Sequence, residues 1–275
     1  MGGSLKDVGV AVALSGAVVP FPTGGARRVH PRPTDVYRPR PTSEGSTQQP
    51  GPNRFDDPQH HYPVRYLAEV LYVCLLEVLA RLRPSAPADG VLNEMSPGLD
   101  DPALADLVDP EQAAALEDFL ARNKVAVFGA PSGAVLRKLV DVFDPAVLAA
   151  LDDHHWIRDH LGRPETVAAY GDDEGAVHLD GSLIRNASRK VGRPVTQQIS
   201  RLLIDILGMR GLRYYSRHAE GVEAICWAVH GDVTLPVRSV EPLDSNNDVH
   251  RAAVQLVATR YRLPLPMAWA SSLTS

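Results

Sequence analysis

Hydrophobic residues recur at helical spacing in several stretches of the chain. The clearest stretch places Leu71, Leu75 and Leu79 on one side of a helical wheel. Asp144 is suited to cap the start of another helix, and Gly208 is suited to end one. The pattern predicts helices over residues 69–83, 110–123, 144–148, 195–207 and 249–260.

Short apolar runs bounded by turn residues indicate strands between these helices. They are predicted over residues 35–38, 64–67, 125–128, 136–142, 211–215 and 224–229. Strands and helices are mixed without the regular alternation of a doubly wound sheet. The sequence therefore favours the α+β class over α/β.

The pattern also divides the chain into three parts. Residues 1–34 have no helical or strand period, which predicts a loose N-terminal extension. Residues 35–230 form the predicted main domain, and residues 231–275 are expected to pack on it as a C-terminal extension. Irregular segments are predicted at residues 41–63, 86–107 and 154–191.

Composition is that of an ordinary globular protein, with 44% hydrophobic and 22% charged residues. A net charge of -5 argues against general nucleic-acid binding, which usually needs a basic face. Cys74 and Cys226 lie in apolar runs and are expected to be buried free thiols of a reducing compartment. The apolar run at residues 8–19 is shorter than the ~20 residues that span a bilayer, so a cytoplasmic location without membrane contact is predicted.

Three residue types suited to binding a dinucleotide follow one another in the first third of the chain. Arg54 lies in the turn-rich run Asn-Arg-Phe-Asp-Asp-Pro at 53–58, Tyr66 in a predicted strand and Glu77 on a predicted helix. A guanidinium can bind phosphate, and an aromatic ring can stack on a planar base or nicotinamide. A carboxylate can stabilise positive charge that develops at a ribose C1′.

Each of these side chains also has an ordinary structural interpretation. Arg54 can pair with a neighbouring aspartate on the surface, Asp56 or Asp57. Tyr66 can belong to the core, as aromatic residues of strands often do. The residues alone leave both interpretations open.

Glu77 and Ser216 present the same choice. Glu77 can form an exposed i,i+4 pair with Arg81, or it can lie at the edge of a cleft. Ser216, between two predicted strands, can make a local turn or hold a phosphate or ribose.

The sequence lacks the motifs of several other enzyme classes. Histidines occur at positions 60–61, 154–155 and 160, without H-E-x-x-H spacing, and no metal site is expected. There is no Walker loop, no G-x-G-x-x-G after a strand and no G-x-S-x-G elbow.

Several short motifs, taken in order, resemble the RES-domain family. They are Tyr-Arg at 37–38, Asn-Arg-Phe-Asp-Asp-Pro at 53–58, Tyr-Leu-Ala-Glu at 66–69 with Glu-Val-Leu-Ala at 77–80, Gln-Gln-Ile at 197–199 and Tyr-Tyr-Ser-Arg at 214–217. The match spans roughly residues 35–230. No single motif is specific, but their order and spacing are.

The resemblance implies an α+β fold similar to ADP-ribosyltransferases of the diphtheria-toxin type, with a split mixed β-sheet and flanking helices. It implies a toxin of a toxin–antitoxin pair that consumes NAD by breaking the nicotinamide–ribose bond, with phosphate or water as the acceptor. NAD is then the substrate, and no metal is required. The implied partner is a helical antitoxin of the Xre type, which carries a helix-turn-helix and blocks the pocket.

The resemblance also implies a role for individual residues. Glu77 would be the catalytic carboxylate, and Arg38 and Arg54 would hold the NAD phosphates. Tyr66 would contact the nicotinamide or its ribose, and Ser216 would complete the pocket.

Two positions depart from the family pattern. Asn53 stands where a glycine is usual, although Asn also tolerates the left-handed conformation. Glu223 stands where the family often has Asn. A protein ADP-ribosyltransferase and a non-catalytic NAD-binding protein of the same fold are the alternative functions. A homo-oligomer and a toxin–antitoxin hetero-oligomer are both compatible with the sequence.

Overall fold

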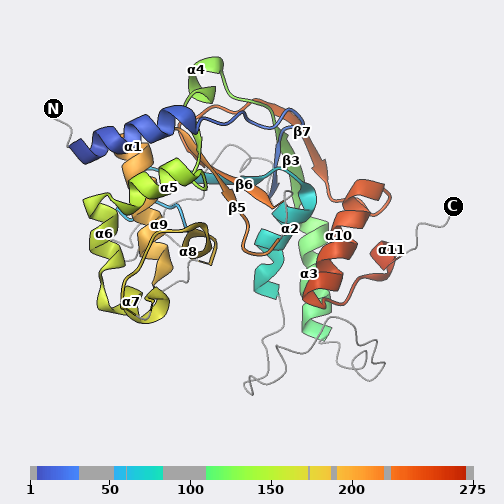
Figure 1. Cartoon of the computed structure of the whole chain (residues 1–275). Coiled ribbons are helices and arrows are strands. Elements are labelled where there is room, and N and C mark those ends of the chain that lie inside the picture. The colour runs from blue at the N-terminus through green and yellow to red at the C-terminus, as the bar shows by residue number, and fades with distance from the viewer. Residues whose placement is uncertain are drawn as a thin grey trace.

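The structure is a computed structural model that describes residues 5–30, 53–59, 61–82, 110–172, 174–186, 191–219 and 224–270 (Figure 1). Its strands are β1 (Ala26–His30), β2 (Val64–Ala68), β3 (Lys124–Phe128), β4 (Leu139–Asp141), β5 (Gly211–Tyr215), β6 (Ile225–His230) and β7 (Val237–Pro242). Its helices are α1 (Leu5–Gly16), α2 (Leu71–Leu79), α3 (Pro110–Arg122), α4 (Gly133–Leu136), α5 (Pro145–Asp152), α6 (His155–Leu161), α7 (Pro164–Tyr170), α8 (Gly181–Asn186), α9 (Gly192–Ser200), α10 (Asp248–Tyr261) and α11 (Met267–Ala270). A 3-10 turn at Ala80–Leu82 follows α2, and a π-helix at Arg201–Ile206 follows α9.

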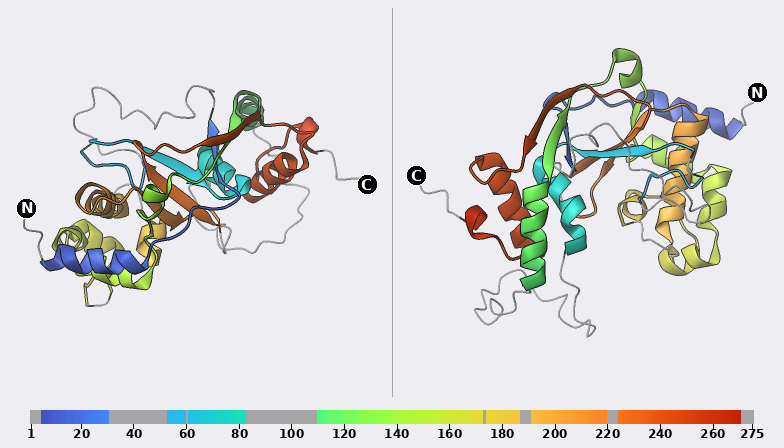
Figure 2. Two further views of the ribbon diagram at one scale, coloured as in Figure 1. Left: turned by 90° about the horizontal axis from the view of Figure 1, so that it is seen from above. Right: turned by 180° about the vertical axis from the view of Figure 1, so that it is seen from behind.

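The described strands form one mixed seven-stranded sheet in the order β4-β5-β6-β2-β1-β3-β7. β4 and β5 are parallel, and the other neighbours are antiparallel. The helices gather in two groups, α1 and α5–α9 on one side and α2, α3, α10 and α11 on the other (Figures 1 and 2). The prediction of the α+β class is confirmed, whereas the likeness to the ADP-ribosyltransferase fold stays a prediction.

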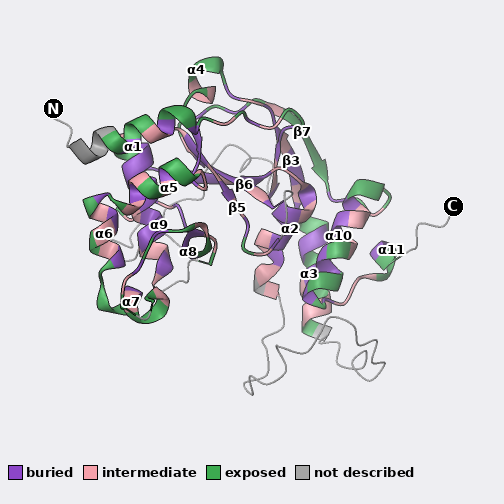
Figure 3. Ribbon diagram, in the orientation of Figure 1, coloured by how far each residue is buried: buried purple, intermediate pink, exposed green. Residues whose placement is uncertain are grey.

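Alternate residues of a strand point to opposite sides, and inner strands of the sheet are buried on both faces, whereas the edge strand β7 is largely exposed. In β6, Cys226 and Ala228 belong to the larger apolar cluster, and Trp227 and Val229 belong to a smaller one on the other face. Figure 3 shows the inner strands largely buried, and the edge strand β7 and the outer faces of the helices exposed. Phe21 covers the second face, with its ring centroid 5.3 Å from that of Trp227.

Local sequence signals explain several helix boundaries. The Asp144 side chain accepts from the backbone N–H groups of Ala146 and Val147, which confirms it as the N-cap of α5. Gly208 has a φ of 69°, the left-handed conformation expected of a residue that follows a helix. The helix predicted over 195–207 continues past Ser200 as the π-helix, in which Leu207 N–H donates to the Leu202 carbonyl, 3.0 Å away.

Several expectations about the elements are wrong. Residues 1–34 were expected to have neither helix nor strand, but α1 lies there and β1 is an interior strand between β2 and β3. The segment 154–191, predicted to be irregular, contains α6, α7 and α8. The strand predicted over 136–142 is the end of α4 followed by the shorter β4. The strand predicted at 35–38 lies outside the described residues.

The C-terminal part joins the rest of the fold at two places. β7 pairs with β3 as the edge of the sheet, and α10 packs against α2. Asn247 caps α10 by accepting from the N–H groups of Val249 and His250. Within the described ranges, no helix combines the length and the apolar character needed to cross a membrane.

Candidate functional site

Arg54 lies in a loop before β2 and is almost entirely buried, with 8% of its side chain exposed. Its Nη1 donates to the carbonyls of Ile184 at 3.4 Å, Arg185 at 3.1 Å and Tyr215 at 3.4 Å. Two of these carbonyls belong to the last residues of α8, where backbone acceptors lack helical partners. The guanidinium therefore joins the end of α8 to the end of β5.

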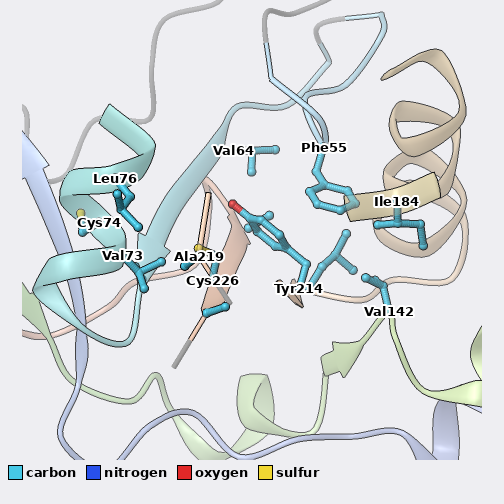
Figure 4. Close-up of a cluster of buried hydrophobic side chains, with 14 of the residues drawn as sticks. Phe55, Val64, Val73, Cys74, Leu76, Val142, Ile184, Tyr214, Ala219 and Cys226 are labelled. Carbon is cyan, nitrogen blue, oxygen red and sulfur yellow. The ribbon is translucent and has the colours of Figure 1, made fainter. Parts of the chain in front are cut away.

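The guanidinium of Arg54 also lies against the aromatic ring of Tyr214. The Arg54 Cζ lies 4.8 Å from the ring centroid of Tyr214, a cation–π distance. The Phe55 ring packs against the same tyrosine at 4.9 Å, and Figure 4 shows Tyr214 among the labelled core residues. Burial is the main cause that raises the pKa of the Tyr214 phenol well above its ordinary value. The interpretation of Arg54 as a solvated charge paired with a neighbouring aspartate is wrong.

Glu77 projects from α2 toward this arginine, and 28% of its side chain is exposed. Its Oε1 accepts from the Ser216 hydroxyl at 2.5 Å and lies 3.6 Å from Arg54 Nη2. Both contacts are to the same carboxylate oxygen, and Oε2 has no bonded partner among the described residues. Among the described residues, the carboxylate is therefore held on one side only, through Oε1. The Arg81 side chain, its alternative partner, lies outside the described residues.

Ser216 follows β5 directly and is completely buried. While its hydroxyl donates to Glu77, the same oxygen accepts from the backbone N–H of His218 at 3.0 Å. The Ser216 backbone is also fixed, because its carbonyl accepts from Arg185 Nε at 3.0 Å and its N–H donates to the Ala224 carbonyl at 2.7 Å. This hydroxyl thus has a single orientation toward the carboxylate.

Tyr66 lies beside the loop that carries Arg54. Its hydroxyl accepts from the N–H of Phe55 at 3.0 Å and donates to Asp56 Oδ1 at 2.9 Å. Burial, followed by the charge of Asp56, raises the pKa of the Tyr66 phenol well above its ordinary value. The stacking of Tyr66 on nicotinamide stays a prediction.

The structure brings three predicted site residues together: Arg54 and Ser216 both contact Glu77. The printed contacts of Tyr66 are with Phe55 and Asp56, in the loop that carries Arg54. The fifth, Arg38, lies outside the described residues, as does Glu223. Asn53 does not adopt the left-handed conformation that Asn tolerates, because Arg262 is the one non-glycine residue with positive φ in the described part of the chain.

Sequence reasoning missed two contributors to the site. Arg185, in α8, binds the Ser216 carbonyl, and nothing in the surrounding sequence marks it. Asp56 was considered as an ion-pair partner of Arg54 but instead accepts from Asn53 and Tyr66. A carboxylate close to an asparagine in a turn is a known signal for such local bonds.

Outside these residues, the described ranges contain no metal-binding cluster but do contain a hollow in the surface. No group of three or more His, Cys, Asp or Glu side chains there is arranged to hold a metal ion. A hollow lies between α4 and the segment after β6, with Ser132, Arg210 and Asp232 in its lining. None of the predicted site residues contributes to that hollow.

Comparison with known proteins gives little similarity. No family model matches the chain, and no curated protein matches its sequence. One solved chain does match, from the crystal structure of the M. tuberculosis MbcT–MbcA toxin–antitoxin complex. The match covers 92% of this chain and 99% of that one, at 14% sequence identity and a TM-score of 0.43.

Proposed function

We propose that this protein is a toxin-like enzyme that consumes NAD by cleaving its nicotinamide–ribose bond. The observation that carries the proposal is the orientation of Glu77, whose Oε1 is fixed by Ser216 at 2.5 Å and faces Arg54 at 3.6 Å. The motif resemblance to the RES-domain family supplies the substrate class. The same resemblance supports a helical Xre-type antitoxin as the partner that blocks the pocket.

The proposed chemistry follows from the carboxylate. When the bond to nicotinamide lengthens, positive charge develops at the ribose C1′, and a fixed carboxylate stabilises it. Glu77 Oε2 is the oxygen left for this role or for orienting the acceptor, which is phosphate or water. Because the carboxylate is already oriented, little reorganisation is needed at the moment of reaction.

Arg54 is proposed to serve both the carboxylate and the substrate. Its Nη1 is occupied by three backbone carbonyls, so Nη2 and Nε are the atoms that can still donate to a substrate phosphate. Arg38 is the second proposed phosphate contact, and Tyr66 and Ser216 complete the proposed pocket. Because the guanidinium is buried, its attraction to an anion is stronger than the same attraction would be in bulk water.

The test is incubation with NAD in the presence and absence of inorganic phosphate, with products identified by chromatography. We expect nicotinamide release, and a Glu77→Gln variant should lose about 100-fold or more of the rate. Glu117→Gln is the matched control, because Glu117 lies on the exposed surface of α3. Release that requires phosphate identifies phosphorolysis, and release without it identifies hydrolysis.

The remaining outcomes separate the alternatives. If labelled NAD transfers its label to a protein band, the activity is protein ADP-ribosylation. If calorimetry detects NAD binding while no nicotinamide is released, the protein is a non-catalytic NAD-binding protein. In cells, expression should lower NAD and arrest growth, and Glu77→Gln should relieve both effects. Growth arrest with a constant NAD level would contradict the proposal.

A further inference from the structure

The backbone around Arg54 is held by side chains rather than by a helix or a strand. On one side of the loop, the Asn53 N–H donates to Asp56 Oδ2 at 2.9 Å. The Phe55 N–H donates to the Tyr66 hydroxyl at 3.0 Å. The N–H groups of the two residues that flank Arg54 therefore both bind a side-chain oxygen.

The carbonyls of the same two residues are held from the opposite side by α9. Gln197 Nε2 donates to the Asn53 carbonyl at 3.0 Å, and the Ser200 hydroxyl donates to the Phe55 carbonyl at 2.7 Å. Ser200 and Gln197 are both buried, so water competes little for these bonds. With N–H and carbonyl groups satisfied on both sides, the loop has one preferred conformation.

Asp56 and Tyr66 connect these bonds into one network. Asp56 Oδ2 accepts from both the N–H and Nδ2 of Asn53, each at 2.9 Å. Asp56 Oδ1 accepts from the Tyr66 hydroxyl at 2.9 Å, and that hydroxyl in turn accepts from Phe55. The raised pKa of Tyr66 keeps its phenol protonated, which preserves the donor to Asp56.

We infer that Asp56 and Tyr66 are positioning residues, which act together to set the Arg54 guanidinium against Glu77. The inference rests on the proposed function and adds to it a role for Asp56 and for the Tyr66 hydroxyl. It differs from a stacking role for Tyr66, in which the aromatic ring suffices. A displacement of about 1 Å in such a group can lower a rate about 100-fold.

The test compares Tyr66→Phe, Asp56→Ala and the double variant in the intact chain. If the two residues act as one unit, each single variant should lower kcat/KM for NAD by about 10-fold or more, and the double variant by no more than the larger single effect. Asp56→Asn, which keeps one acceptor oxygen, should recover part of the loss. If Tyr66 acts only by stacking, Tyr66→Phe should match the unaltered protein, and the inference is overturned.

Asp244→Ala is a matched control, because Asp244 Oδ1 also accepts from the N–H and Nδ2 of a nearby asparagine, Asn246, in an exposed turn. A second readout needs no activity: hydrogen exchange at the Phe55 amide should be at least ~10-fold faster in Tyr66→Phe and Asp56→Ala, and unchanged in the control. Unchanged exchange in all variants would overturn the inference. If the unaltered protein releases no nicotinamide, the proposed function fails, while the exchange result still decides whether the network holds the loop.

Discussion

At the scale of single residues, the site depends on two groups that meet at one carboxylate oxygen. Arg54 and Ser216 both contact Oε1 of Glu77, and each is fixed by further bonds to backbone. The position of Arg54 requires an arginine, because only a planar guanidinium presents several donors in the fixed directions that these acceptors need. Lysine carries a similar charge but cannot reproduce those directions.

Replacing Arg54 by lysine should therefore be destabilising. The lysine side chain is shorter and lacks the planar guanidinium, so it cannot form all of the hydrogen bonds to the carbonyls at the end of α8. We therefore expect the free energy of unfolding to fall by about 2 kcal/mol. Urea unfolding measures this loss. Arg122→Lys is the control, because Arg122 is 73% exposed on α3 and should change stability little. Equal stability of the two variants would contradict the structural role of Arg54.

The sequence predicted the residue types of the site better than their partners. Glu77, Arg54 and Ser216 were predicted as candidates, but the contact between Ser216 and Glu77 spans 139 positions. No local pattern encodes a pairing at that distance, because it depends on the tertiary placement of α2, which packs on β1, β2 and β6. Arg185 escaped notice for the same reason.

At the scale of elements, the N-terminal segment shows how tertiary packing overrides a weak local pattern. β1 carries Arg27 and Arg28 in sequence, which hides the alternation of a strand, yet it pairs with β2 and β3. α1 lacks a strong apolar face, but Val10 and Leu14 are buried and the helix packs against α5. Elements with clear periodicity, such as α2, α3 and α10, were predicted within a few residues of their bounds.

A pair of substitutions in α1 tests whether this helix belongs to the folded core. Val10 is fully buried and Val12 is 67% exposed. Val10→Asp should lower the free energy of unfolding by about 3 kcal/mol, because it buries an unpaired carboxylate, whereas Val12→Asp should change it by less than about 0.5 kcal/mol. Thermal or urea unfolding of both variants gives the comparison. If both leave the stability unchanged, α1 does not contribute to the core.

At the scale of the whole molecule, the two thiols report on global unfolding. Cys74 on α2 and Cys226 on β6 are both free and buried. Burial raises the pKa of the Cys74 thiol to about 12, from an ordinary value of 9.0, and raises that of Cys226 well above its ordinary value. The native protein therefore keeps both thiols neutral and inaccessible near pH 8.

Two results follow from this burial. A thiol-reactive reagent at pH 8 should label neither cysteine in the native protein and both in denaturant. The unfolded thiol of Cys74 loses its proton near pH 9 and the folded one near pH 12, so this contribution to stability is complete below about pH 9 and decreases as pH rises toward 12. The urea concentration at the midpoint of unfolding should therefore be lower at pH 10 than at pH 8. Rapid labelling of the native protein would contradict the described burial.

The spread of the site along the chain has a consequence for synthesis. Arg54 binds the carbonyl of Tyr215, which lies 161 positions later, and Glu77 needs the hydroxyl of Ser216. A ribosome delivers the chain from its N-terminus, so Arg54 and Glu77 emerge long before the segment that fixes them. Until that segment has left the exit tunnel, the nascent polypeptide cannot assemble the arrangement. A product terminated by a premature stop codon before Ser216 would lack it permanently.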